Sequence, residues 1–145
     1  MTAFKGSKTA ENLMKAFAGE SQARGRYTYY AEKAVAEGFE QIAEIFRETA
    51  YNEEMHARLY FDHLVANLGN DMVVINGADY PVALGKTEDN LKASAEGEHA
   101  EWTEIYPNFA KDAEGEGFPE IAKTFTRIAG VEEKHEIRYN KLLDS

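Results

Sequence analysis

Hydrophobic residues recur every three to four positions in four long segments of the chain, which is the spacing of one face of an α-helix. The segments cover about residues 9–37, 39–64, 87–113 and 119–142. The first two are separated by little more than Gly38, and a break this short predicts two antiparallel helices joined as a hairpin. The pattern therefore predicts an all-α protein.

The stretch between the second and third segments, residues 69–86, has no helical period and contains internal Gly and Pro breaks. Its eighteen residues reach roughly 60 Å when extended, whereas a helix of about 28 residues is about 42 Å long. The stretch can therefore run the whole length of a bundle, and Thr87 is expected to cap the helix that follows. This connectivity predicts a ferritin-like four-helix bundle with one long crossover between helices 2 and 3.

Charged residues lie inside the apolar stripes of all four predicted helices. The second helix contains Glu53-x-x-His56, and the fourth contains Glu132-x-x-His135. Three residues is just under one helical turn, so each pair points a carboxylate and an imidazole from the same face. One such pair often occurs by chance, but here both copies interrupt an apolar stripe. The complete inward-facing set is Glu20, Glu53, His56, Glu98, Glu101, Glu132 and His135.

The two halves of the chain are related by a spacing of 79 residues. Both Glu-x-x-His pairs follow this relation, and Tyr27 corresponds to Tyr106. Glu20 departs from it, because adding 79 gives His99, one residue beyond Glu98. We therefore predict that the third helix accommodates one extra residue in a π-bulge between Glu98 and Tyr106, a feature that often marks functional sites.

The inward-facing carboxylates require a counter-charge, because burying even one unpaired carboxylate costs several kcal/mol. Two divalent or trivalent cations would bring the five glutamates close to neutrality. Mixed imidazole and carboxylate ligation favours iron or manganese over magnesium or calcium, and zinc could substitute. The sequence has no cysteine, which excludes disulfides and thiolate-bound clusters within it. The residues therefore predict a site for two metal ions.

Charge and hydropathy restrict the partners and the location. The formal net charge of −10 argues against nucleic acid and anionic membranes as partners. Residues 1–8 lack the apolar run of a signal peptide, and no stretch has enough consecutive apolar residues to span a bilayer. We therefore expect a cytoplasmic protein whose residues 1–145 form a single domain.

The residues around the predicted ligands resemble those of the rubrerythrin family, and the resemblance covers essentially the whole chain. The motifs that carry it are residues 16–24 (Ala-Phe-Ala-Gly-Glu-Ser-Gln-Ala-Arg), Glu48-Thr49-Ala50 leading into Glu53-x-x-His56, Gly97-Glu98-His99 through Glu101 to Tyr106-Pro107, and Glu132-Glu133-x-His135. The resemblance implies that Glu53 and Glu132 bridge two irons. It also implies that Glu20 and Glu98 bind one iron each and that His135 stays on its iron.

The resemblance further implies a ligand exchange in which Glu101 is replaced by His56 when the irons are reduced from Fe³⁺ to Fe²⁺. This exchange is reasonable in charge terms, because one carboxylate leaves as the metal pair loses two positive charges. Tyr27 and Tyr106 correspond to tyrosines that hydrogen-bond to the site carboxylates.

The implied activity is that of a rubrerythrin-type peroxidase, which reduces hydrogen peroxide to water and protects against oxidative stress. Typical members append a rubredoxin-like domain with two cysteine pairs, whereas this sequence is cysteine-free and resembles the shorter erythrin or sulerythrin type. Electrons are then expected from an external donor such as a rubredoxin or an NAD(P)H-linked reductase. A homodimer is expected from the family, and exchange of helices between subunits stays open.

Three alternative functions fit the sequence less well. A ferritin-like ferroxidase that handles or stores iron uses the same fold, but usually lacks the second Glu-x-x-His and the extra glutamate. A non-catalytic helical module would leave the buried glutamates unexplained. Metalloprotease chemistry is disfavoured because Tyr139 stands where the second histidine of His-Glu-x-x-His would be. His63 and His99 are expected at the surface or around the site rather than as ligands.

Overall fold

A computed structural model describes residues 3–145. Met1 and Thr2, which are expected to belong to the same domain, lie outside the described residues. The helical elements are α1 (Lys8–Ala36), α2 (Glu40–Leu68), α3 (Thr87–Ala100), the π-helical segment η1 (Glu101–Ile105), α4 (Tyr106–Glu116) and α5 (Pro119–Asp144).

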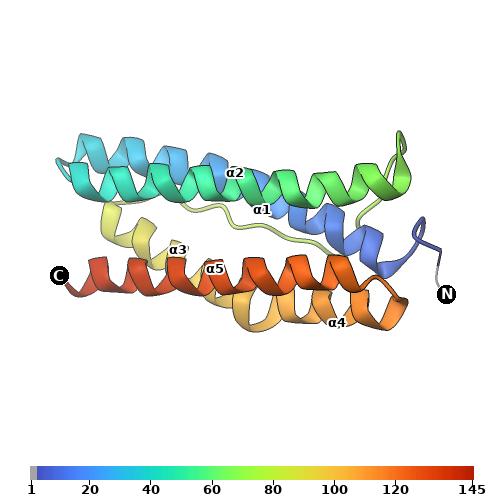
Figure 1. The fold of residues 1–145 in the computed structure, drawn as a ribbon. Coiled ribbons are helices and arrows are strands. Elements are labelled where there is room, and N and C mark those ends of the chain that lie inside the picture. Colours follow the sequence, from blue (N-terminus) through green and yellow to red (C-terminus); the bar gives the residue numbers. More distant parts are fainter. Residues whose placement is uncertain (1–2) are drawn as a thin grey trace.

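The helices form two antiparallel hairpins that pack against each other (Figure 1). One hairpin is α1 with α2, and the other consists of α5 and the rod made by α3, η1 and α4. Residues 69–86 run along the bundle from the end of α2 to the start of α3 (Figure 1). The predicted four-helix bundle with one long crossover is confirmed.

The two hairpin turns repeat the same backbone geometry. Gly38 and Gly117, which are 79 residues apart, have φ of 87° and 89°. This left-handed conformation is accessible to glycine at little cost. The N–H groups of Phe39 and Phe118 each donate to a carbonyl five residues back, at 2.8 Å in both turns. The repeat seen in the sequence is therefore also a repeat of structure.

The predicted N-cap at Thr87 is wrong. Lys86 occupies the cap position, and Thr87 is the first residue of α3. Both the N–H and the hydroxyl of Thr87 donate to Oε1 of Glu37, at the end of α1, with an N–O distance of 2.7 Å for the N–H. The carboxylate from the neighbouring helix thus does what a capping side chain would do, and its charge suits a helix N-terminus.

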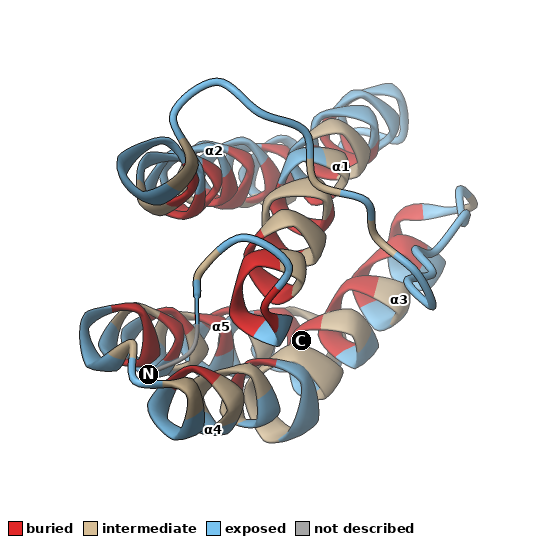
Figure 2. Cartoon of the chain, turned by 90° about the vertical axis from the view of Figure 1, so that its right-hand side faces the viewer, coloured by how far each residue is buried: buried red, intermediate tan, exposed pale blue. Residues whose placement is uncertain are grey.

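Two buried aromatic clusters occupy the interior on either side of one layer of polar residues. The first contains Tyr27, Tyr30, Phe46 and Tyr139, and the second contains Tyr60, Tyr106 and Phe125, with the partly buried Phe109 packed against it. Along each long helix, the predicted ligands lie between residues of one cluster and residues of the other. Figure 2 shows that the buried faces of the helices point toward this shared interior.

Within residues 3–145, no helix combines the length and the apolar character needed to cross a membrane.

Candidate metal centre

The bundle brings carboxylates from all four long rods into its interior. Glu20 from α1, Glu53 from α2, Glu98 from α3 and Glu132 from α5 each have 0% of their surface exposed. The two histidines of the Glu-x-x-His pairs are nearly as buried, with 7% exposed for His56 and 6% for His135. Each of these six residues continues the buried stripe of its own helix.

Six of the seven predicted ligands form two overlapping groups. In each group, four candidate ligand atoms all lie within 4.8 Å of one another. The first group is Glu20, Glu53, His56 and Glu132, and the second is Glu53, Glu98, Glu132 and His135. Two carboxylates therefore belong to both groups, an arrangement that allows each of them to contact two ions.

Both imidazoles direct Nδ1 toward the shared carboxylates. Nδ1 of His56 lies 3.1 Å from Oε1 of Glu53 and 3.4 Å from Oε1 of Glu132. Nδ1 of His135 lies 3.3 Å from Oε1 of both Glu132 and Glu98. The two rings are 6.3 Å apart between centroids. Nδ1 is therefore the nitrogen of each histidine that is placed to bind an ion.

The hydrogen bonding of these groups tests whether they suit metal ions. Among residues 3–145, neither oxygen of Glu53 or Glu132 has a hydrogen-bond partner. The same holds for one oxygen of Glu20, one oxygen of Glu98, and Nδ1 of both histidines. Buried acceptors are normally satisfied, because leaving them unpaired costs free energy. The donor set of carboxylates and imidazoles fits a pair of iron or manganese ions.

Two tyrosines hold the remaining oxygens of the outer carboxylates. Tyr27 donates its hydroxyl hydrogen bond to Oε1 of Glu98, and Tyr106 donates to Oε1 of Glu20, both at 2.7 Å. Each bond connects one hairpin to the other, and each leaves Oε2 of its glutamate free. Burial raises the pKa of both phenols well above the ordinary value, so both stay protonated and remain donors.

The interior carboxyls perturb one another strongly. Burial raises the pKa of Glu53, Glu101 and Glu132 well above the ordinary carboxyl value. For all three, the negative charge of Glu20 is the next largest cause. In the absence of cations, the folded chain would therefore hold protons that the unfolded chain releases.

The predicted π-bulge is confirmed at η1. The N–H of Tyr106 donates to the carbonyl of Glu101, five residues back instead of four. Glu101 opens this segment and is half-buried, and it belongs to neither ligand group. The structure thus places the seventh predicted ligand next to the assembled six, at the point where the helix is locally widened.

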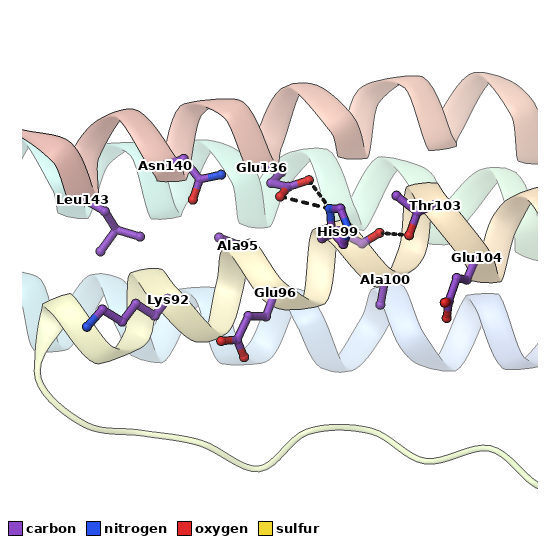
Figure 3. A pocket seen from close by; sticks show the side chains of 10 residues that line it. All are labelled: Lys92, Ala95, Glu96, His99, Ala100, Thr103, Glu104, Glu136, Asn140 and Leu143. Atoms are coloured by element: carbon purple, nitrogen blue, oxygen red, sulfur yellow. Dashed lines mark hydrogen bonds and ion pairs between the residues drawn. The ribbon is translucent and has the colours of Figure 1, made fainter.

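A surface groove of about 540 Å³ lies between α3 and α5, and no predicted ligand lines it (Figure 3). His99 points into this groove and is exposed, as predicted for a residue that is not a ligand. Its Nδ1 lies 2.9 Å from Oε1 of Glu136, and Nε1 of Trp102 donates to the same oxygen at 2.6 Å. No local sequence pattern indicates this contact, because Trp102 and His99 lie 34 and 37 residues from Glu136.

Sequence reasoning also missed Asn52, whose Nδ2 lies 3.4 Å from Nε2 of His135. Asn52 precedes a predicted ligand by one residue, yet it contacts a histidine 83 residues away on the facing helix. Only the packing of α2 against α5 reveals this pair.

Comparison with known proteins identifies the family. The rubrerythrin family model matches residues 11–143. Rubrerythrin-1 of Clostridium acetobutylicum is 59% identical over 143 residues, which cover 99% of this chain and 73% of that protein. The rubrerythrin of Nitratidesulfovibrio vulgaris is 48% identical over 140 residues, which cover 96% of this chain and 71% of that protein.

Solved structures give the same result. Nigerythrin in its fully reduced, all-ferrous state matches with a TM-score of 0.82 at 32% identity, over 99% of this chain and 74% of that chain. Symerythrin from Cyanophora paradoxa, reduced with dithionite, matches with a TM-score of 0.70 at 22% identity, over 89% of this chain and 81% of that chain, and supports the fold alone. Because the family model spans nearly all of the sequence and the identities are high, this chain belongs to the rubrerythrin family.

Proposed function

We propose that this chain is a di-iron oxidoreductase that reduces hydrogen peroxide to water with electrons from an external donor. Membership of the rubrerythrin family supports the di-iron oxidoreductase role. The observation that carries the proposal is the pair of ligand groups that share Glu53 and Glu132 in an interior where their oxygens lack partners among residues 3–145.

The proposed ligands follow from the two groups. Glu53 and Glu132 each offer one oxygen to either ion, Glu20 and His56 complete one set, and Glu98 and His135 complete the other. Iron is proposed because a matched nigerythrin structure is all-ferrous, and manganese or zinc could occupy the same ligands.

A reduced iron pair, when bound, supplies the two electrons that convert one hydrogen peroxide and two protons into two water molecules. The protein's own part is to keep the site dry and its carboxylates oriented. Tyr27 and Tyr106 fix Glu98 and Glu20, and the two aromatic clusters close the interior on both sides.

We further propose that Glu101 and His56 alternate as ligands. The Glu101 carboxylate would offset the greater positive charge of a ferric pair, and the neutral His56 imidazole would suit a ferrous pair. The position of Glu101 on η1, outside both ligand groups, supports this proposal. His56, by contrast, is already in a group, which corresponds to the arrangement proposed for the reduced site.

The partners are also proposals. These 145 residues contain no cysteine, so no thiolate-bound iron centre can form within them. The electrons are proposed to come from a centre outside these residues, such as a rubredoxin or an NAD(P)H-linked reductase. We also propose that the chain forms a homodimer, that it is cytoplasmic and that residues 1–145 form one domain.

The function is tested by iron content and by single turnover. Iron-loaded, fully reduced protein should hold about two irons per chain and should oxidise on rapid mixing with hydrogen peroxide, consuming one peroxide for each iron pair. Absorbance in the stopped-flow instrument and metal analysis measure both quantities. Retention of many irons per chain in a cage assembly would instead indicate ferritin-like iron handling, and failure of peroxide to oxidise the site would refute peroxide reduction.

Substitution of a shared ligand should empty the site. Glu53→Ala removes an oxygen donor from both groups, so iron content is expected to fall close to zero. The matched control is Glu54→Ala, because Glu54 is the exposed neighbour on the same helix. Metal analysis after identical loading gives the comparison, and full iron content in Glu53→Ala would contradict its bridging role.

Substitution of the exchanging ligand should have a different effect. His56→Ala is expected to keep its iron but to slow turnover about 10–100-fold, the range found for groups that support a metal site. His63→Ala serves as the control, since His63 lies on the same helix and contacts Thr124 instead. Loss of both irons in His56→Ala, to the same extent as in Glu53→Ala, would rule out the exchange.

The raised carboxyl pKa values predict how metal removal changes stability. A carboxyl whose pKa is raised on folding stabilises the folded state at pH values below the ordinary carboxyl pKa of 4.5. This contribution to stability is lost as the pH rises through the raised pKa. The thermal midpoint of the metal-free protein should therefore decrease as the pH rises above 4.5, whereas the loaded protein should show a smaller decrease. Glu132→Gln should flatten the metal-free profile, and the exposed control Glu133→Gln should not. A midpoint that rises with pH in the metal-free protein would contradict the assignment.

A further inference from the structure

The two histidines differ on the side that faces away from the carboxylates. Nε2 of His135 lies 3.4 Å from the Asn52 amide, which reaches it from the facing helix. Within residues 3–145, no hydrogen bond to the His56 ring is found, although that ring is equally buried. The inner sides of the two rings are alike, since both direct Nδ1 toward Glu53 and Glu132.

This difference coincides with a break in the internal repeat. The spacing of 79 residues relates Glu53 to Glu132, His56 to His135 and Tyr60 to Tyr139. Applied to Asn52, the same spacing gives Val131. Valine has no side-chain hydrogen-bonding group, so the position equivalent to Asn52 cannot support the other histidine in this way.

The chemistry of the imidazole decides what Asn52 must do. A neutral histidine that binds an ion through Nδ1 carries its proton on Nε2, and this N–H needs an acceptor. A terminal amide presents an acceptor when its carbonyl oxygen faces the ring. The Asn52 side chain makes no other hydrogen bond in the described part of the chain, so a half-turn of its amide group would break nothing.

We propose that Asn52 is a positioning residue whose amide oxygen accepts a hydrogen bond from Nε2–H of His135 and fixes that ring with Nδ1 toward the metal ions, whereas His56, with Val131 at the equivalent place, is left able to turn. This inference rests on the proposed di-iron function and deepens it. It accounts for why His56, and not His135, exchanges with Glu101: the His135 ring is held by Asn52, whereas the His56 ring is not.

The test uses the cobalt(II)-loaded protein, with cobalt as the probe. The Nε2–H proton of a histidine bound to paramagnetic cobalt gives a strongly shifted NMR signal that disappears by exchange with water. The wild-type protein should show one such proton that exchanges slowly, from His135, and one that exchanges rapidly, from His56. In Asn52→Val the slow proton should become fast, and one of the two cobalt affinities should fall about 10–100-fold.

Three further variants separate positioning from a general loss of structure. Asn52→Asp keeps an acceptor and should preserve the slow proton. Val131→Asn supplies an anchor for His56 and should produce a second slow proton. Asn67→Val replaces an exposed asparagine on the same helix, which bonds only to the His63 carbonyl, and should match the wild type.

The outcomes distinguish the two proposals. Unchanged exchange rates and cobalt affinities in Asn52→Val, with both ions bound, would overturn the role of Asn52 and leave the metal centre intact. Failure of the wild-type protein to bind two cobalt ions would overturn the metal centre itself, and the role of Asn52 with it.

Discussion

The structure depends on the convergence of four fully buried carboxylates, one from each long rod of the bundle. Each carries oxygens without hydrogen-bond partners among residues 3–145, an arrangement that is costly in a dry interior. Bound cations would relieve this cost and would join the two hairpins at the same time. The glutamates are therefore poor choices for the stability of the metal-free chain and good choices for a chain that binds metal.

The rest of the bundle offsets the free-energy cost of burying this layer of carboxylates. Aromatic clusters pack on both sides of it, and they keep water away as well as contributing buried apolar area. Tyr27 and Tyr106 belong to these clusters through their rings and to the site through their hydroxyls. Hydrogen bonds to ionised acceptors are stronger than those between neutral groups, so these two residues connect the hairpins where the carboxylates repel one another.

Local patterns predicted much of this arrangement. The stripe spacing located the helices, and the one-residue mismatch between Glu20 and Glu98 located the π-helical segment. Contacts between distant residues could not be predicted in this way. Thr87 was expected to cap its own helix from its residue type and its place before the third stripe, whereas its actual acceptor, Glu37, lies 50 residues away. The contact of Asn52 with His135 depends on how two helices face each other, which no local pattern encodes.

The repeat and its two breaks suggest how a symmetric scaffold could support an asymmetric reaction. A strictly repeated pair of hairpins would give both ions the same ligands and the same freedom of movement. The extra residue in η1 brings Glu101 beside the site from one hairpin only, and the Asn52–Val131 difference supports one histidine only. In the proposed exchange, the first break would supply the replacement ligand, Glu101, and the second would leave the His56 imidazole able to give way to it. An exchange confined to one ion needs both, because a replacement ligand is of no use while each existing ligand is held in place.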